Sequence, residues 1–194
     1  MVSDNKIYGL ANDNAICIWI GGTSWEVTGG HVPDTMTNFI IKGSNIYGLG
    51  QDQKVWVSSI NKDTWVACTP GWMMNFTLWG GWIYGVGTDK HVYRTREGPS
   101  PTSWEQVTHG SVTQVEVFDD IIYGLGMEGA IYKWSGNSWM KIIDGPMTSF
   151  AVEESFIFGV GKDNKIYKCT RDWIKTTEGF SSPITLKLGS YSKL

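Results

Sequence analysis

The sequence lacks both a strong excess of one charge and a long apolar run. Its 16 Lys and Arg residues nearly balance 19 Asp and Glu residues, and the formal charge is −3 at pH 7. Without a basic cluster to meet a phosphate backbone, nucleic acid is not an expected partner. No stretch reaches the roughly 18 consecutive apolar residues of a membrane-spanning helix. The N-terminus, MVSDNKIYGL, has no basic segment followed by an apolar one, so we expect a cytoplasmic protein that does not insert into membranes.

Cysteine and histidine are also scarce. The three cysteines, Cys17, Cys68 and Cys169, are an odd number at wide and irregular spacing, which fits neither a disulfide framework nor a Cys-x-x-Cys metal site. The histidines are scattered, and none lies in a His-Glu-x-x-His motif. We therefore expect reduced, structural thiols and neither a metal nor a cofactor.

The motifs of common enzyme classes are missing as well. Residues 124–129 read Gly-x-Gly-x-x-Gly, but the following AIYKW is typical of a strand, whereas a dinucleotide site needs a helix there. Asp119 with Asp120, and Glu153 with Glu154, are carboxylate pairs of the kind that glycosidases use. Each pair directly precedes a predicted hairpin strand, which favours a solvated turn. We expect no catalytic activity, and an enzyme is only our third hypothesis.

What the sequence does have is one pattern written five times. An Ile-Tyr-Gly triplet, with Phe in place of Tyr in the last copy, recurs at steps of 39, 37, 39 and 35 residues. Its first residues are Ile7, Ile46, Ile83, Ile122 and Ile157. A nearly constant period close to forty residues is typical of a repeat architecture.

Each repeat predicts four strands. An alternating stretch such as NFIIKG precedes the triplet, a polar turn and a β-rich pair follow it, and a lone tryptophan then begins a further extended stretch. These tryptophans are Trp25, Trp65, Trp104, Trp139 and Trp173. Four antiparallel strands per repeat predict a blade of a β-propeller. We expect the tryptophans to fill the space between blades, and the alternative is that their rings stack on a sugar.

The two ends of the sequence predict how the ring closes. The first repeat lacks a leading strand, whereas residues 183–189 alternate like a leading strand that no hairpin follows. Pairing residues 183–189 with residues 6–11 would complete the first blade and protect open sheet edges. The fold prediction is therefore an all-β, single-domain, five-bladed propeller over residues 1–194, with four-stranded antiparallel blades and a ring closed by the C-terminal strand.

The repeat from Trp65 through Tyr93 resembles the tectonin repeat of fungal, slime-mould, fish-egg and invertebrate lectins. The resemblance covers essentially the whole chain, although tectonins commonly have six blades. Five blades occur in the horseshoe-crab lectin tachylectin-2, whose repeats are longer. The resemblance implies a lectin that binds glycans between adjacent blades. Some fungal tectonins recognise methylated sugars and act in defence, so it also implies these as finer expectations.

The candidate ligand residues lie on one face of the predicted ring, where the turn between the second and third strands meets the link to the next blade. Every such turn carries an acid, namely Asp13, Asp52, Asp89, Glu128 and Asp163. The links carry Thr69, Thr108 and Thr177, each two residues before a glycine, and His31 lies in the longer first link. Carboxylates and hydroxyls can hydrogen-bond sugar hydroxyls, but Asp and Gly are also ordinary turn residues.

Two further tryptophans, Trp72 and Trp82, do not recur in the other repeats. Of these we expect Trp72 to contact ligand, together with Asp89. The resulting hypothesis is a monomeric or weakly oligomeric lectin with several similar but unequal sites for glycans or glycoconjugates. The alternative is a non-enzymatic propeller scaffold that binds a protein partner on the same face.

Overall fold

The computed structural model describes residues 2–3, 6–13, 15–31, 35–60, 62, 64–98, 103–154 and 156–170. In these ranges it has nineteen strands in five antiparallel sheets. The first sheet holds β1 (Val2–Ser3), β2 (Lys6–Leu10), β3 (Ala15–Gly21) and β4 (Ser24–His31); the second holds β5 (Met36–Lys42), β6 (Asn45–Gly50), β7 (Val55–Ser59) and β8 (Val66–Ala67).

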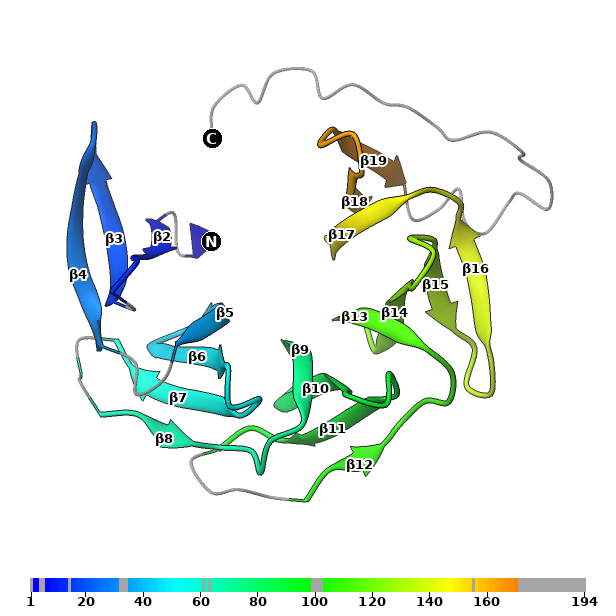
Figure 1. Ribbon diagram of the computed structural model, residues 1–194, viewed down its shortest axis with the longest axis horizontal. Coiled ribbons are helices and arrows are strands. Elements are labelled where there is room, and N and C mark those ends of the chain that lie inside the picture. The colour runs from blue at the N-terminus through cyan, green and yellow to red at the C-terminus, as the bar shows by residue number, and fades with distance from the viewer. Residues whose placement is uncertain are drawn as a thin grey trace.

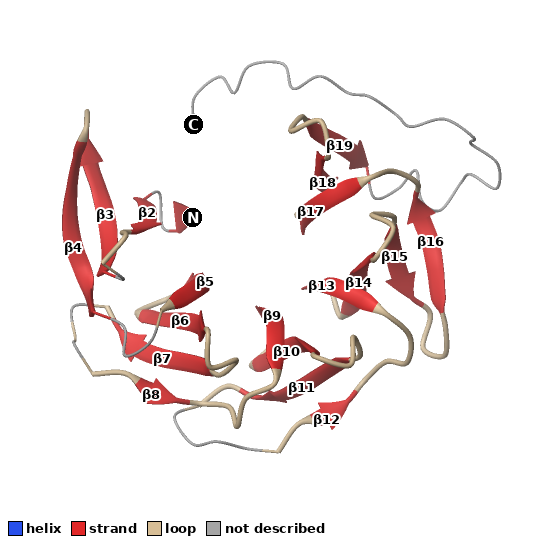
Figure 2. Ribbon diagram, in the orientation of Figure 1, coloured by secondary structure: helices blue, strands red, loops and turns tan. Residues whose placement is uncertain are grey.

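The third sheet holds β9 (Met73–Trp79), β10 (Trp82–Gly87), β11 (Val92–Arg96) and β12 (Glu105–Gln106). The fourth holds β13 (Val112–Phe118), β14 (Ile121–Gly126), β15 (Ile131–Trp134) and β16 (Trp139–Ile143); the fifth holds β17 (Met147–Val152), β18 (Phe156–Gly161) and β19 (Ile166–Thr170). The sheets are arranged around a common centre, with β5, β9, β13 and β17 innermost (Figure 1). The predicted five-bladed β-propeller is confirmed, and the described residues contain strands and loops only (Figure 2).

The first blade differs from the prediction in one respect. The sequence suggested that this repeat has no leading strand of its own, but β1 pairs with β2 through Val2 opposite Ile7 and Ser3 opposite Lys6. In the second blade the equivalent pairing of β5 with β6 extends from Met36 to Lys42. The N-terminal strand thus occupies only the end of the innermost position, at the places that Ile41 and Lys42 fill in the second blade. The predicted closing strand at 183–189 and the tryptophan at position 173 lie outside the described residues.

The core lies between neighbouring blades. Val55 and Cys68 of the second blade form one buried cluster with Phe76 and Ile83 of the third, and Trp104 packs against it. Equivalent clusters lie between the first and second, third and fourth, and fourth and fifth blades. Each blade therefore buries its apolar faces against its neighbours, as expected for a repeat protein whose units contact only adjacent units.

The glycine of the Ile-Tyr-Gly triplet is explained by close packing within the blade. A Cβ added at Gly85 would lie 2.3 Å from the Met73 sulfur atom, and one added at Gly124 would lie 2.9 Å from the Trp139 ring. Real Cβ atoms do not approach other atoms so closely. The glycine of the triplet therefore leaves room for a side chain of the innermost strand, such as Met73, and for the tryptophan that opens the fourth strand, such as Trp139.

Polar side chains tie the innermost strands of neighbouring blades together. Val115 donates its backbone N–H to Asn75 Oδ1 at 3.0 Å, which joins β13 to β9. The Gln114 amide exchanges two hydrogen bonds with the backbone of Phe150 on β17. Two neighbouring pairs of blades are thus joined near the centre of the ring by hydrogen bonds as well as by apolar packing.

A carboxylic acid lies among these central contacts. Glu116 on β13 accepts hydrogen bonds from Thr77 of β9 at 3.1 Å and from Gln114 at 3.2 Å. Burial raises the pKa of Glu116 to about 7, and the negative charge of Glu153 adds to this, although the two hydrogen bonds oppose it. Near neutral pH this carboxyl is therefore partly protonated.

Candidate functional site

The turn between β10 and β11 holds its carboxylate with two local hydrogen bonds. Asp89 Oδ1 accepts from the His91 backbone N–H at 3.1 Å, and Asp89 Oδ2 accepts from the Tyr93 hydroxyl at 2.6 Å. Desolvation raises the pKa of Asp89, but the hydrogen bonds from Tyr93 and His91 outweigh it, and the net pKa is lowered. Asp89 is therefore an ionised acceptor with a fixed direction.

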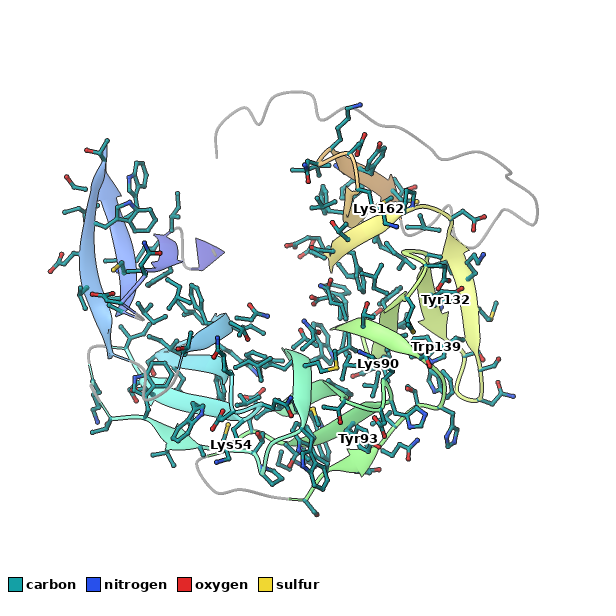
Figure 3. The ribbon with its side chains drawn as sticks, viewed as in Figure 1. Lys54, Lys90, Tyr93, Tyr132, Trp139 and Lys162 are labelled. Carbon is teal, nitrogen blue, oxygen red and sulfur yellow. The ribbon has the colours of Figure 1, made fainter. Side chains whose placement is uncertain are left out.

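A donor side chain four residues after the acid recurs in three other blades, which gives these acids a structural role in their turns. Asp163 accepts from the Tyr167 hydroxyl at 3.0 Å, and Glu128 accepts from the Tyr132 hydroxyl. Asp52 accepts from the Trp56 indole at 3.3 Å, whereas Asp13 accepts from the Ala15 backbone. Figure 3 labels Tyr93 and Tyr132, which come from the third and fourth blades. The partner four residues after the acid is a signal that our sequence analysis missed.

A cavity of about 620 Å³ opens beside the Asp89 turn. It is lined by Pro70, Trp72, Met73, Gly87, Thr88, Asp89, Tyr93, Ser103 and Trp104. The link from the second blade supplies Trp72, and the turn of the third blade supplies Asp89. The structure therefore brings together the two residues that the sequence paired as the best candidate site.

Trp72 has an unusual conformation for a large side chain. It is 71% exposed, and its φ of 75° lies in the left-handed region that favours glycine. Its backbone carbonyl accepts the Thr88 N–H at 3.0 Å, which fixes the link against the turn. An exposed aromatic ring held in a costly backbone conformation at the mouth of a cavity is an unusual feature for a purely structural residue.

The chemistry of the cavity is mixed. Trp72, Met73 and Trp104 supply apolar surface, whereas Asp89 and Tyr93 supply a carboxylate and a phenol. Such a site can bury the apolar face of a small ligand and hydrogen-bond its polar groups.

Comparison of the chain with models of known protein families identifies its family. The model of the tectonin domain matches residues 78–192, which is more than half of the chain. The chain belongs to the tectonin domain family. No curated protein is significantly similar to this tectonin chain in sequence.

Solved structures resemble the tectonin chain in fold. The computationally designed Ika8 protein is 14% identical with a TM-score of 0.55, and the match covers 88% of this chain and 57% of that one. The WD40 propeller of Doa1 is 12% identical with a TM-score of 0.56, covering 75% and 55%. YCF48 bound to D1 peptide is 17% identical with a TM-score of 0.52, covering 72% and 52%. The tectonin chain thus spans little more than half of these propellers, and at this identity the likeness shows the fold alone.

The threonines of the links lie elsewhere than expected. Thr69 and Thr108 are buried, and their hydroxyls accept the backbone N–H groups of Val55 at 2.8 Å and Val92 at 3.2 Å. Their oxygen atoms therefore hold the third strands of their blades and do not face a ligand. We leave both threonines out of the proposed site.

The remaining predicted site residues are not gathered around the cavity. Asp13, Asp52, Glu128 and Asp163 each lie in the turn of a different blade. The backbone of His31 pairs with Ala15 at the end of β4, but its side chain lies outside the described residues, as does Thr177.

The other two histidines lie beside the Asp89 turn. His91 Nδ1 is 3.3 Å from Asp89 Oδ2, and the Gln106 amide nitrogen lies 3.3 Å from His91 Nδ1 and 3.2 Å from His109 Nδ1. Over the part of the chain that the structure describes, no three His, Cys, Asp or Glu residues are grouped as a metal site requires. The same residues include no helix able to span a membrane.

Proposed function

We propose that this tectonin propeller is a lectin that binds without catalysis, and that the cavity around Trp72 and Asp89 is one of its glycan sites. The observation that carries the proposal is the meeting of an exposed indole with a fixed carboxylate–phenol pair in one cavity. An aromatic ring stacks on the apolar C–H face of a pyranose, and a carboxylate accepts hydrogen bonds from its hydroxyl groups.

The local hydrogen bonds leave Asp89 able to bind a sugar. An ionised carboxylate has about four acceptor positions, and the backbone of His91 and the Tyr93 hydroxyl occupy two of them. The Tyr93 oxygen also keeps acceptor capacity while it donates to Asp89. The pair therefore offers directed acceptors to a ligand at little ordering cost.

The finer parts of the proposal concern valency and sugar type. The acidic turn recurs in each blade, but the links beside it differ, so we propose several sites of unequal affinity. Clustered glycans would then be bound with an avidity about 10² to 10⁴ above that of one site. The apolar surface of Trp72, Met73 and Trp104 suits a methylated sugar, and we propose a cytoplasmic lectin that acts in defence.

The test is to replace Trp72 by glycine and measure binding to a glycan array and to the best monosaccharide by calorimetry. Glycine accepts the φ of 75° without strain, so Trp72→Gly should fold at least as well as the natural chain. Loss of the stacking surface should weaken binding about tenfold. The control is Trp19→Ala, which removes another exposed tryptophan, on the first blade. Equal binding by Trp72→Gly and the natural chain would contradict the proposed site.

The second candidate is a propeller that binds a protein partner at the same cavity. The apolar share of the cavity lining favours it, because such a cavity also accepts an apolar side chain of a peptide. The glycan array separates the two hypotheses: a protein-binding propeller would bind no glycan on the array.

A further inference from the structure

Trp82, the other unrepeated tryptophan, is not part of the cavity. Its position is held by Asn45, Ile121 and Phe156 in the other blades. Trp82 begins β10, whereas Gly87, which lines the cavity, ends the same strand. Trp82 therefore lies at the opposite end of the third blade, on the face that carries no part of the proposed glycan site.

Two arginines lie over the Trp82 ring. Arg96 pairs directly with Trp82 across β10 and β11, and its guanidinium carbon is 3.8 Å from the ring centroid. The guanidinium carbon of Arg94 is 4.4 Å from the same centroid. Stacking on an aromatic face stabilises a guanidinium group and fixes the direction of its N–H donors.

Only one of the two guanidinium groups has a counter-ion. Arg94 donates from Nε to Glu105 Oε2 at 3.0 Å and from Nη2 to Glu105 Oε1 at 3.1 Å, so its fork is filled. Among the described residues, no carboxylate pairs with Arg96, whose side chain is exposed.

The acidic residue nearest to Arg96 in sequence does not supply its counter-ion. Glu97, the next residue, forms an ion pair with Lys42 of the second blade. Residues 99–102 read Pro-Ser-Pro-Thr and contain no acid. Two like charges thus share one ring, and the group that would neutralise the second is missing from these neighbours.

We propose that Arg96, held on Trp82, binds an anionic group, a carboxylate or a sulfate, carried by a glycan. Both groups match the planar fork of a guanidinium, which donates two parallel hydrogen bonds to two oxygen atoms. The internal Arg94–Glu105 pair is an example of this geometry on the same ring. The anion site stands on these contacts, and only the naming of a glycan as the carrier rests on the proposed function.

The position of the site has a consequence for recognition. The cavity and the Arg96 site lie at opposite ends of the third blade, so a neutral sugar and an acidic group do not compete. An acidic glycan chain can be bound on one face while neutral residues are bound on the other.

The experiment compares Arg96→Gln with the natural chain. The probes are N-acetylglucosamine 6-sulfate against N-acetylglucosamine, glucuronic acid against glucose, and inorganic sulfate alone. Binding is followed by the NMR shift of the Trp82 indole N–H. The natural chain should prefer each acidic sugar, and Arg96→Gln should lose about threefold to fivefold in affinity for the acidic probes, as expected for an exposed ion pair. Arg96→Lys keeps the charge but not the fork and should recover only part of the loss.

The matched control is Lys62→Gln, which removes one exposed positive charge from the second blade. An equal loss in Lys62→Gln and Arg96→Gln would overturn the proposal, because net charge alone would then explain the effect. No preference of the natural chain for acidic over neutral sugars, with no response of Trp82 to sulfate, would overturn it as well.

The outcomes also separate this site from the proposed function. If neutral glycans bind through Trp72 and Arg96→Gln does not change the binding of acidic probes, the lectin proposal is supported and the anion site is contradicted. Inorganic sulfate bound through Arg96, with no glycan bound by the natural chain, would sustain the anion site and remove the lectin.

Discussion

The tryptophan that opens the fourth strand of a blade is partly buried in one blade and largely exposed in another. Trp139 of the fourth blade, labelled in Figure 3, packs against the buried cluster between the third and fourth blades. Its indole nitrogen is buried. Trp25 of the first blade occupies the same repeat position and is 49% exposed. The same sequence motif thus places a tryptophan between two blades in the fourth blade and on an exposed side in the first.

The fifth blade shows a similar difference in exposure, at an isoleucine of the third strand. Ile131 of the fourth blade is 1% exposed, whereas Ile166, its counterpart in the fifth, is 49% exposed. Over the described residues, Trp25 and Ile166 are therefore exposed at positions where the other blades bury or partly bury the same residue type. The comparison teaches that the motif supplies an apolar face, and that a neighbouring blade is needed to bury it.

The largest expected effect comes from removing residues 183–194, which tests what covers the flank of the first blade. In the described residues β1 pairs only with Lys6 and Ile7 of β2, whereas the sequence predicts that residues 183–189 pair with residues 6–11. Without them the chain should aggregate or lose its folded state, because unpaired strand edges and apolar surface would be open. Size-exclusion chromatography and thermal melting measure this; an unchanged monomer with unchanged melting would refute the predicted closure.

The next effect compares the two tryptophans directly. Trp139→Ala should lower the free energy of unfolding by about 3 kcal/mol, since it leaves a cavity between two blades. Among the described residues the buried indole nitrogen of Trp139 has no hydrogen-bond partner, so its removal breaks no such bond there and the loss stays at the lower end for a tryptophan. Trp25→Ala should cost about 1 kcal/mol or less, because much of the ring is already exposed. Equal losses in urea denaturation would show that the two positions do not differ in solution.

The smallest effect concerns the centre of the wedge between the third and fourth blades. The pKa of Glu116 is raised from 4.5 to about 7, so the folded chain holds this proton more tightly than the unfolded chain. The resulting stability is present below pH 4.5 and is lost as the pH rises through about 7. Glu116→Gln removes this loss and should raise the free energy of unfolding at pH 8 by less than Trp139→Ala lowers it.

The control for this prediction has the opposite sign. The hydrogen bond from Arg94 lowers the pKa of the exposed Glu105, so the ionised form is favoured in the folded chain. Glu105→Gln should therefore not gain stability between pH 4.5 and 8. Melting temperatures of both variants against pH measure the difference, and parallel curves for Glu116→Gln and the natural chain would contradict the assignment.

The sequence predicted the fold because its dominant signals are local and repeated. Alternation around Ile46 and Ile83 indicates strands, and the constant spacing of the triplet indicates blades. The strand β1 was missed because Val2 and Ser3 are too short a segment to show alternation. What a strand pairs with depends on distant parts of the chain, and a single sequence does not contain that information directly.

The candidate site was predicted in part, for a similar reason. Trp72 stood out because it breaks the repeat, and Asp89 because it follows the repeat. The burial of Thr69 and Thr108 was not predicted, because the direction of a hydroxyl depends on which backbone N–H lies beside it. The partnership of Asp89 with Tyr93 was visible only as a spacing of four residues, which carries no meaning until the hairpin brings the two side chains together.

The buried thiol of Cys68 can report on the separation of two blades. Cys68 is fully enclosed between the second and third blades, where its Sγ lies 3.1 Å from the Val55 carbonyl oxygen. Burial raises the pKa of Cys68 to about 12. Because only a thiolate attacks alkylating reagents, Cys68 stays unreactive while the two blades remain together. The rate at which Cys68 is alkylated therefore measures how often the second and third blades separate, and no label has to be introduced beforehand.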